Sequence, residues 1–268
     1  MIQVSVIIPT YNRKALLSRA LRSVLAQNDA AFEIIIVDDG STDGTREMIE
    51  KDFPSVHYFY QANQGPAAAR NRGIERARGE WIAFLDSDDE WLPEKLRTQL
   101  DFFENNPDFL IHQTEEIWIR NGKRVNPMKK HQKHGGWIFE KCLPLCLISP
   151  SAVMMHRRLF DEIGLFDESL PACEDYDLWL RVTSQFPAGL TEKPYVMKYG
   201  GHAGQRSHEF PAMDRFRIYS LKKILGSGKL TPEQTGAAQK MLEEKESIYN
   251  QGALKRGRTG HYETLPSL

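Results

Sequence analysis

The sequence has few cysteines, and their spacing matches no common site. Cys142, Cys146 and Cys173 lack the paired spacing of a zinc site, and an odd number cannot all pair as disulfides within one chain. Such a set suits a reducing compartment, where we expect these thiols to be buried and structural. The cysteine content therefore argues against a disulfide framework.

Long hydrophobic runs, a basic leader and an excess of one charge are also absent. The apolar run between Met1 and Pro9 is too short for a signal peptide, and no stretch is long enough to span a bilayer. The chain has 35 Lys and Arg against 36 Asp and Glu in 268 residues, a formal net charge of −1. We therefore expect a protein of the cytoplasm or of the inner membrane face, with no nucleic-acid partner.

Three common catalytic motifs are missing as well. The first predicted strand is followed neither by a phosphate-binding Gly-x4-Gly-Lys-Ser/Thr loop nor by Gly-x-Gly-x-x-Gly. This argues against a P-loop nucleotide hydrolase and against an ordinary dinucleotide dehydrogenase. No Gly-x-Ser-x-Gly elbow occurs, which argues against a serine hydrolase of that type.

The first hundred residues instead alternate between apolar strands and amphipathic helices. Strands are predicted over 4–8, 32–37, 56–60 and 81–85, with helices over 15–25, 45–50 and 67–74 between them. Asn12 is a predicted cap of the first helix, and Ser41 or Thr42 of the second. This alternation predicts a Rossmann-like α/β fold, with a mainly parallel sheet flanked by helices.

The pattern changes after a helix that follows Pro93. Asn121-Gly122 lies between two short strand signals and predicts a hairpin, and 126–136 is predicted to be a solvated, mobile loop. Strands are expected over 151–156 and 195–199, and helices over 157–163 and from Glu174. A helical C-terminal extension follows, in which Thr231 and Gln234 form a capping box.

Polar residues follow each of the four predicted parallel strands. Because such strands end at the same edge of a sheet, we expect their tips to line one crevice, where ligands bind in open α/β folds. These tips are Thr10-Tyr11, Asp38-Asp39, Asn63 to Gly65, and Asp86 to Asp88.

The last of these tips is unusually acidic. Asp86, Asp88, Asp89 and Glu90 follow a buried strand, and carboxylates this close repel one another unless something compensates them. A divalent metal with oxygen ligands is one interpretation. A solvated turn at the start of the next helix, with Glu90 as a helix-start charge, is the other.

Acids at several strand ends suit an enzyme that acts on a nucleotide sugar. One carboxylate would accept hydrogen bonds from the base or ribose, and others would hold a metal that neutralises the diphosphate. A further carboxylate would take the proton from an acceptor hydroxyl.

Six segments, which span about three quarters of the chain, resemble the family-two glycosyltransferases, inverting enzymes of GT-A fold. The segments occur in the family's order; they are 4–13, 37–45, 63–74, 84–89, 174–181 and 202–207. The resemblance implies transfer of a sugar, most simply from a UDP-sugar, to a hydroxyl of a glycan or lipid-linked acceptor. It also implies a divalent metal, Mn²⁺ or Mg²⁺, and a role in polysaccharide or cell-wall assembly.

The resemblance also assigns roles to residues. Asp175 is expected to be the general base, and Glu174 to contact the acceptor. The nucleotide-sugar set is Pro9, Thr10, Tyr11, Asp39, Gly65, Arg70, Asn71, Asp86 and Ser87, and the metal set is Asp86, Asp88 and His202.

Each role has a structural alternative. Asp38, Asp43 and Asp177 are expected to be loop, cap or helix acids, and Asp175 could be a helix-start charge. His208 competes with His202, the role of Asp89 is open, and Trp91 or Trp179 could stack on a sugar or pack in the core. Lys255-Arg256-Gly257-Arg258 could contact an anionic membrane.

The expected domain arrangement is a GT-A domain over 1–208 and an extension over 209–268. Within the domain, 1–105 is the nucleotide-sugar half and 106–208 the acceptor half. Two other functions are compatible with such a sheet: a sugar-1-phosphate nucleotidyltransferase, and a nucleotide-sugar-binding protein without activity.

Overall fold

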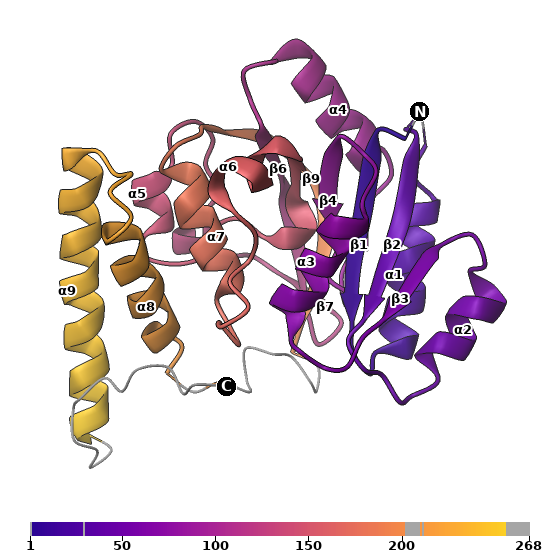
Figure 1. Cartoon of the computed structure of the whole chain (residues 1–268), viewed down its shortest axis with the longest axis horizontal. Coiled ribbons are helices and arrows are strands. Elements are labelled where there is room, and N and C mark those ends of the chain that lie inside the picture. Colours follow the sequence, from indigo (N-terminus) through magenta and orange to yellow (C-terminus); the bar gives the residue numbers. More distant parts are fainter. Residues whose placement is uncertain (1, 29, 202–209, 211, 256–268) are drawn as a thin grey trace.

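The chain folds around a mixed sheet with helices on both faces, as the computed structural model shows (Figure 1). The structure describes residues 2–28, 30–201, 210 and 212–255. Within this part of the chain the strand order is β3-β2-β1-β4-β8-β6-β9-β5, with β7 paired to β6. The strands are β1 (Val4–Thr10), β2 (Phe32–Asp38), β3 (His57–Tyr60), β4 (Trp81–Phe84), β5 (Glu90–Trp91), β6 (Ile111–Arg120), β7 (Lys123–Val125), β8 (Val153–His156) and β9 (Ala188–Gly200).

The two halves of the sheet differ in strand direction. Strands β1 to β4 are parallel, as predicted, whereas β8 is antiparallel to both β4 and β6, and β5 is antiparallel to β9. The second half lacks the regular alternation of strand and helix that builds a parallel sheet, so its strands pair in both senses. The α/β class is confirmed, and the mainly parallel arrangement holds for the first half.

Alternate residues of the strands face two separate cores. Val6 and Ile8 pack with α1, α2 and α4, whereas Ile7 faces α3, α7 and α8. Helices α8 and α9 lie at one end of the molecule, beyond α7 (Figure 1). The helices are α1 (Lys14–Leu25), α2 (Thr45–Asp52), α3 (Pro66–Arg76), α4 (Lys95–Asn105), α5 (Phe139–Cys142), α6 (Arg158–Ile163), α7 (Glu174–Thr183), α8 (Asp214–Leu225) and α9 (Pro232–Lys255), with 3-10 turns η1 (Lys129–His131) and η2 (Pro150–Ala152).

Helix α3 lies close to β1 because its inner face is made of small residues. A Cβ atom at Gly73 would lie 2.4 Å from Cγ2 of Ile7, so a larger residue would push the helix away from the strand. Ala67 and Ala69 are also buried on this helix. The close packing fixes the position of Arg70, which reaches the carboxyl edge of the sheet from α3.

The predicted caps of the first two helices are wrong. Asn12 has a φ of 50° and lies outside α1, and its Oδ1 atom accepts a hydrogen bond from the Thr42 backbone N–H at 2.8 Å. Conversely, Ser41 Oγ accepts from the Asn12 N–H at 2.8 Å. The two loops satisfy each other's polar groups across the sheet edge, and Asp43 binds the Thr45 N–H at the start of α2. Local sequence contains no sign of such a contact.

Glu90 is also placed differently from the prediction. It lies in β5 rather than at a helix start, its Oε2 atom accepts from the Tyr199 hydroxyl at 2.9 Å, and α4 begins only at Lys95. Trp91 and Trp179 are both buried, which places both rings in the core. Lys133, in the loop predicted to be solvated, is buried beside Glu116.

Two local predictions are confirmed. Asn121 and Gly122 have φ angles of 49° and 74°, which are those of a tight primed turn between β6 and β7. At the start of α9 the Thr231 and Gln234 side chains bind each other's backbone N–H groups. No described helix is long and apolar enough to cross a membrane.

Candidate active site

A cavity of about 1270 Å³ opens where β1, β2 and β4 end and α7 begins. The strand tips that the sequence places at one edge do lie together there, as the topology requires. Predicted site residues that line this cavity are Pro9, Thr10, Tyr11, Asp39, Arg70, Asp86, Ser87, Asp88, Glu174 and Asp175.

Gly65 and Asn71 are not part of the lining. Gly65 donates its N–H to the Asp39 carboxylate at 2.8 Å, with a φ of 92° that favours glycine. The Asn71 amide donates to the Phe166 carbonyl at 2.9 Å and to Glu168 at 2.7 Å, so it ties α3 to the loop before α7. Their predicted contacts with a nucleotide sugar would therefore be indirect in this arrangement.

The β1 end of the cavity offers an aromatic ring and a free hydroxyl. Tyr11 is 47% exposed, although it is a large aromatic side chain. Thr10 Oγ1 is buried and has no hydrogen-bond partner in the described part of the chain. An unpaired buried hydroxyl is costly, so Thr10 is suited to binding a polar ligand atom.

Asp39 organises the loop beside it. Its carboxylate is buried and accepts hydrogen bonds from the Gln61 amide at 2.8 Å, the Gln64 N–H at 2.9 Å and the Gly65 N–H at 2.8 Å. An ionised carboxylate has about four acceptor positions, so these contacts leave room for one more donor. The residue therefore both shapes the loop at 61–65 and faces the cavity.

Arg70 connects two parts of the site that are far apart in sequence. Its guanidinium donates to Glu174 Oε1 at 2.6 Å and to Asp86 Oδ1 at 2.8 Å, and the arginine is buried. Burial alone would lower the pKa of Arg70, but the two carboxylates outweigh it and raise that pKa. Burial raises the pKa of Glu174, and Arg70 offsets part of this rise. The β4 tip and the start of α7 are thus held together by one cation.

The other acids of the β4 tip have separate partners. Asp88 Oδ2 accepts from Arg13 at 3.0 Å. Asp89 is buried and accepts from the Ser151 hydroxyl at 2.6 Å and from the Tyr199 N–H at 3.0 Å. Burial raises the pKa of Asp89 despite the nearby Lys198 ammonium. Asp86, Asp88 and Asp89 all line the cavity, and Asp89 also fastens the β4 tip to η2 and β9.

Asp175 lies in the first turn of α7, at the cavity wall. A helix N-terminus attracts negative charge, and Asp175 Oδ1 accepts a hydrogen bond from the Tyr176 backbone N–H there at 2.7 Å. The Cys146 thiol donates to Asp175 Oδ2 at 3.3 Å. Burial raises the pKa of Cys146, with Asp175 adding to the effect, so the thiol keeps its proton. Cys142 and Cys173 are buried as predicted, whereas the Cys146 residue is only partly buried.

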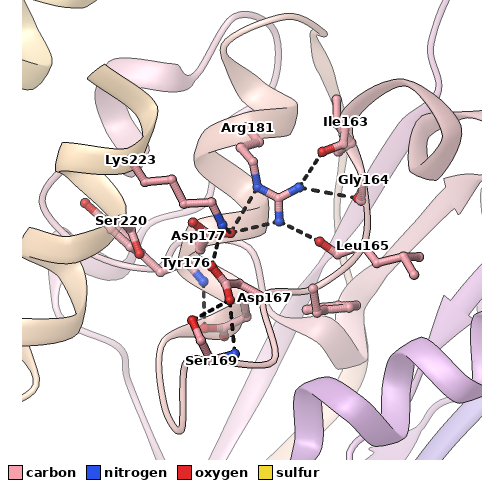
Figure 2. A network of polar contacts seen from close by, with 12 residues as sticks. Ile163, Gly164, Leu165, Asp167, Ser169, Tyr176, Asp177, Arg181, Ser220 and Lys223 are labelled. Carbon is pink, nitrogen blue, oxygen red and sulfur yellow. Dashed lines mark hydrogen bonds and ion pairs between the residues drawn. The ribbon is translucent and has the colours of Figure 1, made fainter. Parts of the chain in front are cut away.

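Asp177, the competing acid on α7, lies away from the cavity lining. Figure 2 shows its carboxylate between Arg181 of the same helix and Lys223 of α8, at 2.8 Å and 3.1 Å. Arg181 also donates to the carbonyls of Ile163, at the end of α6, and of Leu165 in the loop that follows. Asp177 is 2% exposed and joins α7 to the C-terminal extension, which supports its interpretation as a structural acid.

The cavity also contains charged residues that sequence reasoning missed. Lys198 of β9 lines it and donates to Ser149 Oγ at 2.9 Å. Burial would lower the pKa of Lys198, but Glu116, Asp89 and Asp86 raise it, so the ammonium stays charged. Arg13, which contacts Asp88, also lines the site. Arg13 follows the first strand tip in one of the resembling segments, whereas nothing local indicates Lys198.

The residues present fit a divalent cation in part. Asp86 and Asp88 supply carboxylate oxygens, the ligand type that Mg²⁺ and Mn²⁺ prefer, and each of the two acids also pairs with an arginine. Among the described residues, no group of three or more His, Cys, Asp or Glu side chains could hold a metal. His202 and its competitor His208 lie outside the described residues, as do 256–258 of the basic tail.

Comparisons with known proteins agree with this architecture. A solved structure of residues 1–349 of TarS from S. aureus with UDP-GlcNAc has a TM-score of 0.71, 21% identity, and covers 94% of this chain and 73% of that one. The mannosyltransferase PcManGT from Pyrobaculum calidifontis, solved with GDP-Man and Mn²⁺, has a TM-score of 0.65 and 17% identity over 95% and 79% of the two chains. These likenesses confirm the GT-A fold.

Curated relatives are similar over parts of their length. An uncharacterized glycosyltransferase of Rickettsia felis is 40% identical over 193 residues, which are 71% of this chain and 32% of that protein. The putative teichuronic acid biosynthesis glycosyltransferase TuaG of Bacillus subtilis is 48% identical over 103 residues, 37% of this chain and 41% of TuaG. The chain thus spans about a third of the first relative. The model of the family described as glycosyl transferase family 2 matches residues 5–164, and the chain belongs to this family.

Proposed function

We propose that the protein is an inverting glycosyltransferase that moves a sugar from a nucleoside-diphosphate sugar to a hydroxyl of a glycan or lipid-linked acceptor. One observation carries the proposal: Asp175 faces the same cavity as the strand tips that would bind the donor, and Arg70 links the two sides. A UDP-sugar is the favoured donor, since TarS, which has a higher TM-score than the GDP-Man complex of PcManGT, holds UDP-GlcNAc.

The residues that line the cavity have separate roles in this mechanism. Tyr11 and Thr10 would hold the base and ribose, with Asp39 accepting a hydrogen bond from the base. The Asp175 carboxylate takes the proton of the acceptor hydroxyl as the acceptor oxygen attacks the anomeric carbon. The bond from that carbon to the diphosphate oxygen breaks, and the nucleoside diphosphate leaves with the electron pair. Attack from the opposite side inverts the anomeric configuration.

The site also has to compensate the leaving group's charge. A divalent cation held by Asp86 and Asp88 would neutralise the departing diphosphate. Arg70, buried against Asp86 and Glu174, fixes the orientation of these two carboxylates at the cavity. The Cys146 thiol holds Asp175 in place.

Two variants test the proposal, one of which should lose turnover and the other metal-dependent donor binding. With a panel of nucleotide sugars, Asp175→Asn should keep donor binding and lower turnover by about two to four orders of magnitude, because only the proton acceptor is lost. Asp88→Ala should lose the part of UDP binding that Mn²⁺ promotes, as measured by titration with and without the metal.

Other results would point to the competing functions. Normal transfer by Asp175→Asn would show that another group is the base. Release of pyrophosphate from a nucleoside triphosphate would identify a nucleotidyltransferase, and donor binding without transfer or hydrolysis would identify an inactive binding protein.

A further inference from the structure

The hairpin of β6 and β7 and the loop after it have a strong excess of positive charge. From Ile117 to Phe139 the chain contains six lysines and arginines and no aspartate or glutamate. Since the whole chain has a formal net charge of −1, the remainder without these six cations has −7. Five of the six side chains are exposed and form what we call the hairpin surface: Arg120, Lys123, Arg124, Lys129 and Lys130.

These five cations have no acidic partner among the residues that the structure describes. Some exposed arginines elsewhere do pair with a nearby acid, as Arg46 does with Glu50 at 2.8 Å. The sixth cation of the segment, Lys133, is buried and lies 3.4 Å from Glu116, so it neutralises the acid nearest to the hairpin in sequence. The hairpin surface therefore presents unbalanced positive charge, which attracts anions to it.

Arg120, at one end of the hairpin surface, adjoins strand residues that line the cavity. In the β6–β9 pairing, Arg120 lies opposite Gly200. Gly200 directly follows Lys198 and Tyr199 in β9, and both of these residues line the cavity. A Cβ atom at Gly122 would meet nothing within 4 Å, so the turn points into open space. In Figure 1 the hairpin with β7 lies toward the lower edge, where β1 and β2 also end.

We propose that the hairpin surface binds an anionic stretch of the acceptor, a glycan that carries carboxylate or phosphate groups. The proposal rests on the glycosyl transfer proposed above, because an acceptor has to approach the cavity along its mouth. A bilayer with anionic headgroups is the competing partner. Between Ile117 and Phe139 the large exposed apolar side chains are Met128 and Trp137, and two isolated side chains are little for insertion into a membrane. A charged polymer fits this surface better.

Binding of a labelled oligogalacturonate, with a neutral maltooligosaccharide of equal length as reference, tests the proposal. Combined Arg120→Gln, Lys123→Gln and Arg124→Gln substitutions should weaken oligogalacturonate binding about tenfold or more, and added salt should weaken wild-type binding. The matched control combines Arg46→Gln, Lys51→Gln and Lys229→Gln, which removes equal charge from other faces and should have little effect. Both variants should bind UDP like the wild type.

The outcomes separate this inference from the proposed function. Equal loss in both variants, or no loss in the hairpin variant, would overturn it. So would hairpin-dependent binding to phosphatidylglycerol vesicles without binding to oligogalacturonate, since that result identifies a membrane surface. A wild-type protein that binds oligogalacturonate through the hairpin but no nucleotide sugar would instead contradict the proposed function.

Discussion

His112 is a buried histidine whose ring has neutral partners. Its Nε2 atom lies 3.0 Å from Thr191 Oγ1, its Nδ1 atom lies 3.2 Å from the Gln99 amide, and Phe102 packs on the ring. Burial lowers the pKa of His112 to about 3, and Lys95 contributes to this shift. The folded protein therefore keeps this ring neutral at pH values where an unfolded chain protonates it.

We therefore expect His112 to make the free energy of unfolding fall as the pH is lowered. Between about pH 6.5 and pH 3 the unfolded state binds the extra proton, so stability is lost as the pH falls. Urea unfolding should show that the wild type loses about 2 kcal/mol more than His112→Gln between pH 7 and pH 4.5. Parallel losses in the two proteins would contradict this prediction.

Single residues of the site differ in how far the sequence predicts them. Asp86, Asp175 and Arg70 lie in motifs that resemble the family, and the structure brings them to one cavity. Ser151 binds Asp89 across 62 positions of sequence, and no local pattern signals such a pair. The place of Lys198 in the site is equally hard to predict from the sequence, because it depends on acids that other strands contribute.

At the scale of elements, the contact between α7 and α8 positions the catalytic helix. Asp177 is the shared acceptor of Arg181 and Lys223, and Lys223 also contacts Asp167 at 2.6 Å (Figure 2). Because Asp177 is almost fully buried, its removal would leave Arg181 without its carboxylate partner and Lys223 with Asp167 alone.

Asp177→Ala should therefore lower the free energy of unfolding by about 2–4 kcal/mol. A matched control is Glu50→Ala, which breaks another Arg–acid pair four residues apart, but on an exposed helix face. That change should cost less than about 0.5 kcal/mol. Chemical denaturation of both variants measures the difference, and equal effects would show that the network contributes no more than a surface pair.

Most elements are predictable from their own apolar period, but β5 is not. Two residues, Glu90 and Trp91, pair with β9 more than a hundred positions later, so only the tertiary fold defines this strand. The prediction of a solvated loop at 126–136 does not hold for Lys133, for a related reason. Its polar sequence predicts a solvated segment, but Glu116 of β6 supplies a buried partner for Lys133.

For the whole molecule, the sequence predicts a boundary near residue 209 between the GT-A domain and the C-terminal extension. The hydrophobic core, however, continues across this boundary. Phe216, Ile218, Leu221 and Ile224 of α8 are buried in the same cluster as the inner face of α7. Helix α9 packs on α8 but contributes less to the core, with Ala238 and Leu242 as its buried apolar residues. The extension is thus part of the fold through α8, whereas α9 is an outer layer.

Two truncated chains test this view of the extension. Burying four large apolar side chains of α8 stabilises the fold by roughly 6–12 kcal/mol, which is comparable with the whole stability of a domain. A chain that ends at residue 208 should therefore fail to unfold cooperatively, whereas one that ends at Lys229 should fold with stability lower by about 3 kcal/mol. Urea unfolding followed by far-ultraviolet circular dichroism distinguishes them. If the chain that ends at residue 208 unfolds cooperatively near the midpoint of the full chain, α8 contributes no essential part of the core.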